Sequence, residues 1–309
     1  EGANKRILLK ACALVPSFFF ILSRLRRMQP GLVHLFWGHY PSILGFMIRE
    51  TMPQVRLSMF LGAHDLAARL HISAEVANQA DYVFTHAKAN LPLLEEMGIP
   101  AASVTVVHRG VDTVGLDTIV ASTKLHKDPE LVLSAGRLQP YKGFDDTLRI
   151  FAGLREKDRN LRLAILGDGP YKPALIALAE ELKVADSVRF LGHLPHAEVI
   201  RMMAEASLFL FMSRHDGERL PNSVKEAMFC RCICISTNTV GMEELVEHGR
   251  TGFIVPMGEV QAAIELAGAA LSGAYPAMAE AARQAIIRDF SRTSAMQRYM
   301  DTWTQGAGR

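Results

Sequence analysis

Short apolar runs alternate with amphipathic stretches through the second half of the chain. The runs are apolar throughout, without regular polar positions, which predicts strands of a parallel sheet that helices cover on both faces. Such a doubly wound α/β domain binds ligands beyond the carboxyl ends of its strands. The predicted strands lie at residues 131–135, 161–166, 188–191, 208–212, 232–236 and 253–255. The predicted helices lie at residues 144–156, 171–183, 196–205, 222–230, 242–247, 259–272, 276–288 and 294–303.

The first part of the chain repeats this alternation with fewer strands. Residues 113–129 lose the periodicity and carry Thr, Ser, Lys and Asp, as a linker does. We therefore expect a first domain at 1–112, a second domain at 130–288 and a C-terminal helix within 289–309 that returns to the first domain. The first domain has predicted strands at 32–37, 55–61, 81–85 and 103–108 and predicted helices at 41–50 and 87–97.

An apolar segment near the start of the chain allows two interpretations. Residues 11–22 are apolar, and Arg24, Arg26 and Arg27 follow them. The segment is shorter than the ~20 helical residues that span a bilayer. It predicts a core helix with a solvated end, and the alternative is a helix that rests on an anionic membrane surface.

Charge and cysteine usage narrow the function classes. The net charge of +2 gives no overall positive field of the kind that attracts nucleic acid. Cys230, Cys232 and Cys234 alternate along one apolar stretch, so we expect them to share a face of a buried strand, and Cys12 stands alone. This pattern favours packing over a disulfide framework or a metal site, in a reduced cytoplasm.

Two glutamates flank the segment with the most specific chemistry. Glu218 precedes Pro221 and Asn222, and Glu226 lies about one turn into the helix that Asn222 is predicted to cap. The amides at the start of that helix favour an anion. A ligand with phosphates in its middle and hydroxyls at both ends, such as a nucleotide sugar, fits this arrangement.

A glycine-flanked loop after the strand at 131–135 adds positive charge. It begins at Gly136 and ends at Gly143, and it carries Arg137 and Lys142, which can share one diphosphate. It is not a Walker loop, because neither Ser nor Thr follows Lys142 to hold magnesium. The alternative is a surface turn with two solvated cations.

Other strand ends carry weaker signals. Gly192 and His193 follow the strand at 188–191, where a base could meet backbone groups, although a histidine on the rim of the site is the alternative. Glu244 could accept a hydrogen bond from a hydroxyl or could be a charge at a helix start.

Together these segments resemble the retaining glycosyltransferases of family 4, which have the GT-B architecture of two Rossmann-like domains facing a cleft. The resemblance runs from about His34 to the C-terminus. It rests on Gly136-Arg137-Leu138 with Pro140 and Lys142-Gly143, on the glutamate pair, on Glu226-Ala227-Met228, on Glu243-Glu244-Leu245-Val246, on Thr251-Gly252-Phe253 and on Gly110-Val111-Asp112.

The resemblance implies a role for each matching residue. It implies that Arg137 and Lys142 hold the donor diphosphate, that Glu226 binds the ribose hydroxyls and that Glu218 contacts the donor sugar. It places His64 near the transferred sugar, with a helix cap or an interdomain hydrogen bond as the alternative. The expected catalytic residues are thus His64 and Glu218. The expected donor-binding residues are Gly136, Arg137, Lys142, Gly192, His193, Leu220, Pro221, Asn222, Ser223, Glu226 and Glu244.

Two features depart from the family pattern. Arg219 stands where the family usually has a small residue, which puts the local path of the chain in doubt. The first strand and the glycine-rich loop of the family's N-terminal domain have no counterpart in this sequence. We therefore expect that the chain begins inside that domain, as a fragment or a shortened natural form, and that it binds the donor with weak or absent transfer.

The implied activity is transfer of a sugar from a UDP- or GDP-sugar to an acceptor hydroxyl, with retention and without a metal or other cofactor. The expected acceptor is a carbohydrate or a lipid-linked glycan, in polysaccharide or glycolipid assembly in the cytoplasm or at the inner face of the membrane. Two alternatives stay open: a nucleotide-sugar-binding module without turnover, and a GT-B sugar-nucleotide epimerase.

Overall fold

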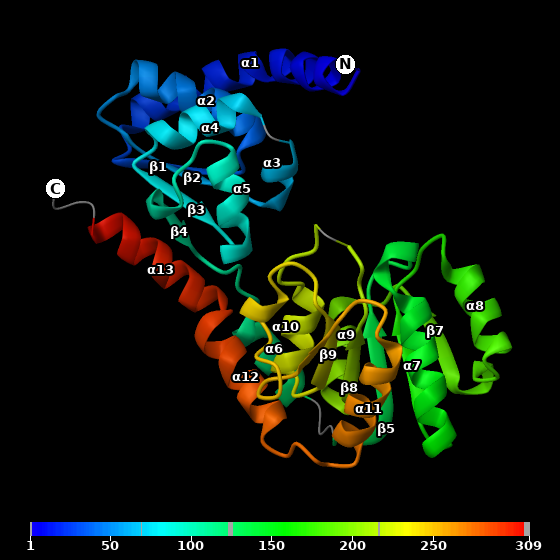
Figure 1. Cartoon of the computed structure of the whole chain (residues 1–309). Helices are drawn as coiled ribbons and strands as arrows, with labels where there is room; N and C mark the ends of the chain where they lie inside the picture. The colour runs from blue at the N-terminus through cyan, green and yellow to red at the C-terminus, as the bar shows by residue number, and fades with distance from the viewer. Residues whose placement is uncertain (1, 69, 123–125, 216, 306–309) are drawn as a thin grey trace. The chain divides into compact units, whose positions relative to one another are not determined.

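A computed structural model of the chain describes residues 2–68, 70–122, 126–215 and 217–305 (Figure 1). Side chains are described from residue 13 onward, except that of His64. The chain forms two compact units, each built on a parallel sheet. Unit 1 comprises residues 1–108 and 298–309, and unit 2 comprises residues 109–297. Among the described helices, none is both long enough and apolar enough to cross a membrane.

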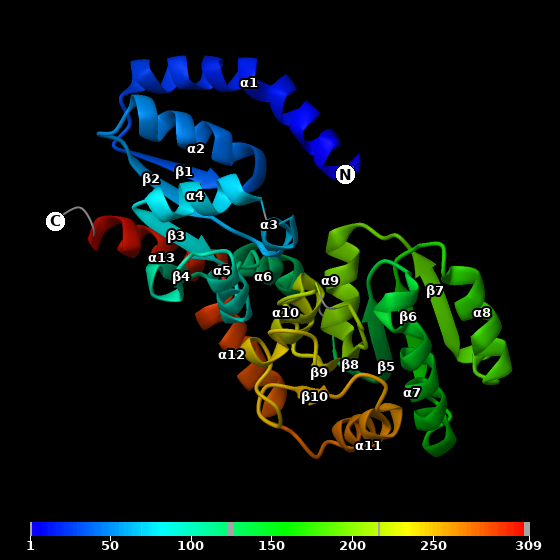
Figure 2. The ribbon, with the colours of Figure 1, turned by 45° about the horizontal axis from the view of Figure 1, so that its top comes forward.

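Unit 1 contains a four-stranded sheet in the order β1-β2-β3-β4, with all pairs parallel. Helix α1 packs against α2, and α2 packs against α4 (Figure 2). Leu57 and Met59 of β2, Ile48 of α2 and Val76 of α4 form the buried centre of this unit. The strands are β1 (Leu32–Phe36), β2 (Arg56–Phe60), β3 (Tyr82–Thr85) and β4 (Val104–Val106), and the helices are α1 (Gly2–Met28), α2 (His39–Thr51), α3 (Ala63–Ala68), α4 (His71–Gln79) and α5 (Leu91–Glu96).

Residues 298–305 belong to unit 1. Helix α13 (Arg292–Gln305) carries Trp303, whose indole Nε1 donates a hydrogen bond to the Ser58 hydroxyl at 3.0 Å. The ring of Tyr299 lies 4.5 Å from that of Phe84. The C-terminal part of α13 therefore packs on β2 and β3.

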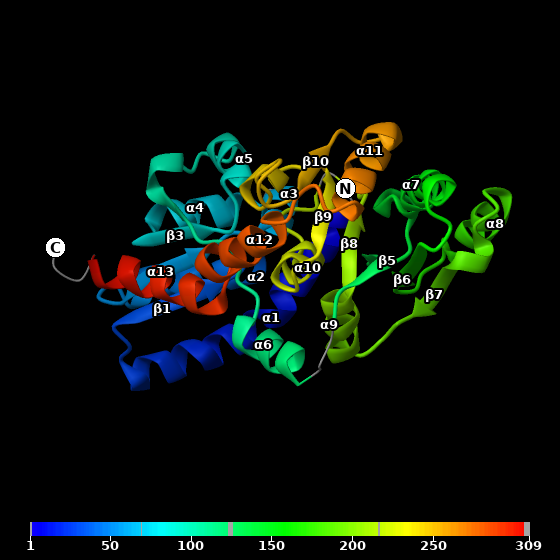
Figure 3. The ribbon, with the colours of Figure 1, turned by 90° about the horizontal axis from the view of Figure 1, so that it is seen from below.

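Unit 2 contains a six-stranded parallel sheet in the order β10-β9-β8-β5-β6-β7 (Figure 3). Helices α7, α8 and α11 pack together on one face, and α9, α10 and α12 pack together on the other. This confirms the predicted doubly wound α/β architecture. The strands are β5 (Asp128–Ala135), β6 (Arg162–Leu166), β7 (Val188–Gly192), β8 (Ala206–Phe211), β9 (Ile233–Thr237) and β10 (Phe253–Val255). The helices are α6 (Thr113–Ala121), α7 (Phe144–Lys157), α8 (Lys172–Glu181), α9 (His196–Glu205), α10 (Asn222–Phe229), α11 (Val260–Leu271) and α12 (Met278–Asp289).

The segment 113–129, predicted to be an irregular linker, is instead largely ordered into elements of unit 2. Asp112 caps α6 by accepting a hydrogen bond from the Gly115 amide at 3.1 Å, and Arg283 binds Asp117 on that helix. The prediction was wrong because α6 buries only Leu116, so its apolar periodicity is weak. Strand β5 already begins at Asp128.

Two smaller predictions also need correction. The helix expected at 242–247 is a single 3₁₀ turn, η5 (Met242–Glu244), and α3 and α4 were not predicted. The cysteines do not share a strand: Cys230 ends α10, Arg231 has a positive φ of 63°, and only Cys234 lies within β9. Cys230, Cys232 and Cys234 are free and buried, and burial raises the pKa of each thiol. The side chain of Cys12 lies outside the described residues.

Candidate functional site

The carboxyl ends of β5, β6 and β7 open into two adjoining cavities that share Ala135, Gly136 and Val199. The larger cavity has a volume of about 520 Å³, and the smaller one about 140 Å³. Both lie at the edge of the sheet where a doubly wound domain binds its ligands. The larger cavity is lined by Arg137, Gly167, Asp168, His193 and His196. The smaller cavity is lined by Lys142, Met212, Glu218, Ser223 and Glu226.

Two glycines let the loop after β5 lie against neighbouring backbone. Gly143 has a φ of +67°, and a Cβ at this position would come within 1.7 Å of the Met212 carbonyl oxygen. Gly167 has a φ of +129°, and its Cβ would lie 1.9 Å from the Gly136 carbonyl oxygen. Glycine is required at both places, because a side chain would meet main-chain atoms as well as an unfavourable φ. Lys142 is thereby held between the loop and the start of α7.

Lys142 and Glu218 form an ion pair on the wall of the smaller cavity. The Lys142 Nζ lies 2.5 Å from Glu218 Oε1, and the Ser213 hydroxyl donates to Glu218 Oε2 at 2.5 Å. Both charged side chains are largely but not fully buried, at 21% and 16% exposure. Each neutralises the other, so an incoming anion must compete with Glu218 for Lys142.

Glu226 lies on α10, and its carboxylate Oε1 is 2.9 Å from His196 Nε2 at the start of α9. Since Glu226 lines the smaller cavity and His196 the larger one, this pair lies where the two cavities adjoin. The preceding segment turns sharply at Leu220, which is buried and has a positive φ of 51°. A positive φ at a non-glycine residue stores strain of a kind that concentrates at functional sites.

Asn222 was predicted to cap α10, and that prediction is wrong. The helix begins at Asn222 itself, and Pro221 occupies the capping position without a side-chain hydrogen bond. The Asn222 side chain instead lies 3.5 Å from the Lys225 ammonium. Among the described residues, no side chain at the capping position binds the amides of the first turn.

The larger cavity brings Arg137 and His193 together with the turn at Gly167. The amide of Gly167 donates to the Gly192 carbonyl at 2.7 Å, which joins the ends of β6 and β7. Arg137 is exposed, and within the described residues its guanidinium has no ion-pair partner. A cation without a partner at this edge is free to bind an anion.

Five predicted site residues with described side chains do not line these cavities: Gly192, Leu220, Pro221, Asn222 and Glu244. Glu244 lies in η5 after β9 and does not line either cavity. His64 lies in α3 of unit 1, and its side chain is outside the described residues. Leu220, Pro221 and Asn222 shape the approach to α10 without lining either cavity. In the described part of the chain, no group of three or more His, Cys, Asp or Glu side chains could hold a metal ion.

Three residues at the site were not predicted. Ser213 follows the carboxyl end of β8, and His196 is the first residue of α9, so a systematic search of strand and helix ends would have found both. Arg219 is the third: its Nε is buried and, within the described residues, has no hydrogen-bond partner. Burial lowers the pKa of this guanidinium.

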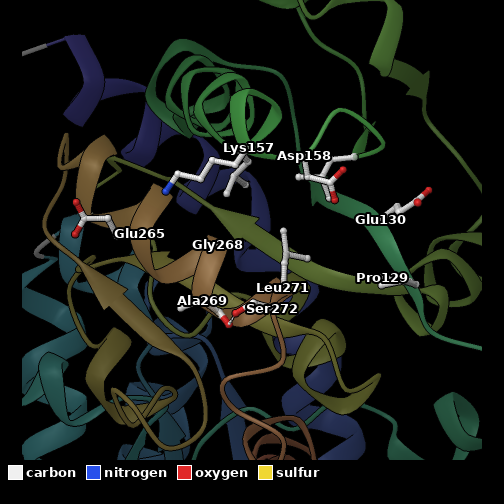
Figure 4. Close-up of a pocket in the computed structure, with 11 residues that line it drawn as sticks. Pro129, Glu130, Lys157, Asp158, Glu265, Gly268, Ala269, Leu271 and Ser272 are labelled. Carbon is white, nitrogen blue, oxygen red and sulfur yellow. Dashed lines mark hydrogen bonds between the residues drawn. The ribbon is translucent and has the colours of Figure 1, made fainter.

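A further cavity of unit 2 lies at the opposite end of the sheet, between the end of α7 and α11. Its volume is about 530 Å³, and Leu154, Leu161 and Leu271 contribute apolar surface. Figure 4 shows Glu130, Lys157 and Glu265 spread around this cavity. Among the described residues, no ion pair joins two of those that line it.

Comparison with known protein families shows which family the second unit matches. A family model described as glycosyl transferases group 1 matches residues 117–287, more than half of the chain. The amylovoran biosynthesis glycosyltransferase AmsK of Erwinia amylovora is 27% identical over 249 residues, which cover 76% of this chain and 60% of AmsK. The glycogen synthase of Mycobacterium tuberculosis is 27% identical over 229 residues, which cover 73% of this chain and 54% of that protein. The chain thus spans less than two-thirds of the length of these curated relatives.

Solved structures show the same architecture. HepE from Anabaena in complex with UDP aligns with a TM-score of 0.75 at 19% identity, covering 94% of this chain and 82% of HepE. The lipopolysaccharide outer core galactosyltransferase WaaB aligns with a TM-score of 0.72 at 18% identity, covering 94% of this chain and 79% of WaaB. These similarities show an α/β fold with two parallel-sheet domains, as in GT-B glycosyltransferases.

Proposed function

We propose that this chain, which belongs to the glycosyl transferases group 1 family, binds a UDP- or GDP-sugar and transfers the sugar to an acceptor hydroxyl with retention. The observation that carries the proposal is the pair of cavities at the carboxyl edge of the unit 2 sheet. Cations and a helix start lie there beside two carboxylates, in the arrangement that a nucleotide sugar requires. The names of AmsK and WaaB support a carbohydrate or lipid-linked glycan as the acceptor, in polysaccharide or glycolipid assembly.

Each end of the donor has a partner in this proposal. Arg137 and Lys142 bind the diphosphate, and Glu226 accepts hydrogen bonds from the ribose hydroxyls. Glu218 contacts the transferred sugar. His193 and the backbone near Gly192 lie beside the base, because Gly192 ends β7 and His193, the next residue, lines the larger cavity. The donor must displace two internal contacts, Lys142 with Glu218 and His196 with Glu226.

The proposed chemistry is charge stabilisation at the leaving group. The bond between the sugar C1 and the diphosphate oxygen breaks, and the electron pair stays on the diphosphate. Arg137, Lys142 and the uncapped amides of α10 stabilise that charge without a metal ion or cofactor. The acceptor oxygen attacks C1 from the same face, and its proton passes to the leaving phosphate, which accounts for retention without a carboxylate nucleophile. His64 is assigned to a sugar or acceptor hydroxyl on the resemblance alone.

The binding of Lys142 to Glu218 couples donor recognition to sugar recognition. When the diphosphate takes Lys142, the Glu218 carboxylate loses its cation and can accept hydrogen bonds from sugar hydroxyls. Glu218 therefore becomes available at the moment when the sugar arrives. A carboxylate hydrogen bond to a hydroxyl is charge-assisted, at about 1.5–3 kcal/mol.

The first test is a thermal-shift screen with UDP, GDP and the corresponding nucleosides. Ligands that bind only the folded state raise its apparent stability, so at least one diphosphate should raise Tm more than its nucleoside does. If neither UDP nor GDP changes Tm or binds in calorimetry, the proposed function is wrong.

A labelled nucleotide sugar then separates the three candidate activities. Transfer to an added glycan or lipid-linked acceptor supports the glycosyltransferase. Binding without transfer or hydrolysis points to a nucleotide-sugar-binding module. Epimerised donor that forms without an acceptor points to the epimerase.

The proposal includes contact with a membrane surface, at the cytoplasmic face where lipid-linked acceptors are assembled. Phe19 and Phe20 on α1 are 60% and 64% exposed. Arg24, Arg26 and Arg27 lie on the next turns of the same helix and are also exposed. An apolar surface bordered by arginines suits the interface of an anionic bilayer.

Vesicle sedimentation tests this contact. The protein should bind vesicles of phosphatidylglycerol and phosphatidylcholine more tightly than vesicles of phosphatidylcholine alone, and the F19S/F20S variant should lose most of that binding. Equal binding of both vesicle types by wild type and variant would rule out this surface.

A further inference from the structure

An ion-pair network beside the smaller cavity joins the segments that carry Lys142 and Glu218. Arg214 follows β8 and reaches the first turn of α7. Its Nη2 lies 3.0 Å from Asp145 Oδ2, its Nη1 3.2 Å from Asp145 Oδ1 and its Nε 3.1 Å from Asp146 Oδ2. Asp145 and Asp146 are only 8% and 5% exposed, so their charges depend on these partners.

The ion pairs of this network keep Asp145 ionised, although burial favours its neutral form. Burial raises the pKa of the Asp145 carboxyl, but hydrogen bonds from Arg214 and Arg149, together with their charges, outweigh burial and hold the pKa below its usual value. The Asp145 and Asp146 carboxylates in turn raise the pKa of Arg214, against the effect of its partial burial. Without Arg214, Arg149 would be the one cation among the described residues that pairs with two nearly buried carboxylates.

The main chain of Arg214 is tied to the same place. Its amide donates to the Tyr141 carbonyl at 2.8 Å, directly beside Lys142. The neighbouring Ser213 donates to the Glu218 carboxylate at 2.5 Å. Arg214 therefore connects the segment that carries Glu218 to the region around Lys142 in two ways. Its amide binds the turn before Lys142, and its guanidinium binds the first turn of α7.

We propose that Arg214 is a positioning residue that sets the geometry between Lys142 and Glu218 by locking the Glu218 segment onto the start of α7. Asp145 and Asp146 follow Lys142 by three and four residues, so the first turn of α7 is a rigid connection between the network and the ammonium. The inference rests on the proposed function, since Lys142 and Glu218 are the groups that meet the donor diphosphate and sugar.

Arg149 provides a matched control. Its Nη1 contacts the same two carboxylates, at 2.8 Å from Asp145 and 3.1 Å from Asp146. It lies on α7 itself, so these ion pairs connect one turn of a helix to the next and do not reach the Glu218 segment. Arg149→Gln and Arg214→Gln thus remove similar ion pairs, but only Arg214→Gln removes a connection between α7 and the segment that carries Glu218.

The experiment compares these variants with wild type in calorimetry and in donor kinetics. The probes are UDP and uridine, or GDP and guanosine if that diphosphate binds wild type more tightly. Arg214→Gln should leave nucleoside affinity unchanged, and should lower diphosphate affinity and kcat by about 10- to 100-fold, as a misplacement of about 1 Å does. Arg149→Gln should change either quantity by no more than about fivefold, the range of a partly exposed ion pair.

A rescue variant separates positioning from loss of stability. Adding Asp145→Asn and Asp146→Asn to Arg214→Gln removes the unpaired charges, so the triple variant should recover thermal stability but not diphosphate affinity or kcat. Recovery of affinity together with stability would overturn the inference, as would equal effects of Arg149→Gln and Arg214→Gln. If wild type binds a diphosphate and Arg214→Gln binds it equally well, the inference about Arg214 is wrong and the proposed function stands. If wild type binds neither diphosphate, the proposed function itself is wrong.

Discussion

Two cavities of unit 2 have almost the same volume, about 520 and 530 Å³, and lie at opposite ends of one sheet. At the carboxyl end, Arg137 and His193 meet on short turns that follow strands, and the adjoining smaller cavity carries the Lys142–Glu218 pair. At the amino end, charged side chains border an apolar surface, and among the described residues no ion pair joins two of those that line it (Figure 4). Volume therefore does not distinguish the two cavities. What distinguishes them is convergence of charged groups and backbone amides, which parallel strands produce at their carboxyl ends.

Backbone conformation separates the two ends as well. Gly143 at the carboxyl end combines a positive φ with main-chain atoms close to where a Cβ would be. Gly268 at the amino end lies inside α11, and the nearest atom to its Cβ would be the Leu154 side chain at 3.9 Å. The first glycine is required by the loop, whereas the second is not required by its helix.

The largest expected effect is on the free energy of unfolding, and a glycine-to-alanine substitution should change it in opposite directions at the two ends of the sheet. Gly143→Ala should lower the free energy of unfolding of unit 2 by about 2–5 kcal/mol, because it adds both an unfavourable φ and an overlap with the Met212 carbonyl. Gly268→Ala should raise it by about 0.5–1 kcal/mol, because alanine loses less entropy than glycine in a helix. Denaturant midpoints measure both changes. A similar loss in both variants would show that the carboxyl-end loop is no more constrained than the helix.

The second effect concerns phosphate binding. Arg137→Ala and Lys142→Ala should each weaken nucleoside diphosphate binding by about 1.5–3 kcal/mol and leave nucleoside binding almost unchanged, because their charge meets phosphate oxygens only. Lys157→Ala, which removes a lysine from the amino-end cavity, is the control and should change neither. Calorimetry distinguishes the cases, and an equal loss of nucleoside and diphosphate affinity would remove the loop from the phosphate site.

The sequence predicted the sheets better than it predicted the contacts of the site. All ten strands of the described residues were predicted, because buried parallel strands are apolar along their whole length. Helix α6 was missed because it buries only Leu116. A helix without a wide apolar face gives no periodic signal.

At the site, residue types were predictable and their pairings were not. Arg137, Lys142, Glu218 and Glu226 stand out in the sequence because they follow strands or flank a helix start, and all four line the two cavities. The partner of Lys142 lies 76 positions away, and Arg214 lies 69 positions from Asp145. Such contacts depend on how β5 and β8 pair in the sheet, which local pattern does not contain.

A smaller effect tests the ribose end of the site. Glu226→Gln should weaken nucleoside and nucleoside diphosphate binding alike by about 1 kcal/mol, the difference between a charge-assisted and a neutral hydrogen bond. Glu265→Gln at the amino-end cavity should have no effect on either ligand. If Glu226→Gln affects only the intact sugar donor, its carboxylate meets the sugar and not the ribose.

The smallest effect has an unusual sign and is specific to the carboxyl end. The Glu218 carboxylate pairs with the Lys142 ammonium when no ligand is bound. Glu218→Gln removes this competitor, so it should raise affinity for UDP or GDP by up to about fivefold, which is the free energy of a partly exposed ion pair expressed as a ratio of affinities. The same change removes a carboxylate from the sugar, so the intact nucleotide sugar should gain less affinity than the diphosphate, or lose some. Asp158→Asn provides the control, since Asp158 lines the amino-end cavity and, within the part of the chain that the structure describes, forms no ion pair. Calorimetry with the diphosphate and with its sugar conjugate gives both numbers. A fall in diphosphate affinity would mean that Glu218 supports the phosphate site and does not compete with it, and a rise in Asp158→Asn would mean that the gain reflects net charge and not this ion pair.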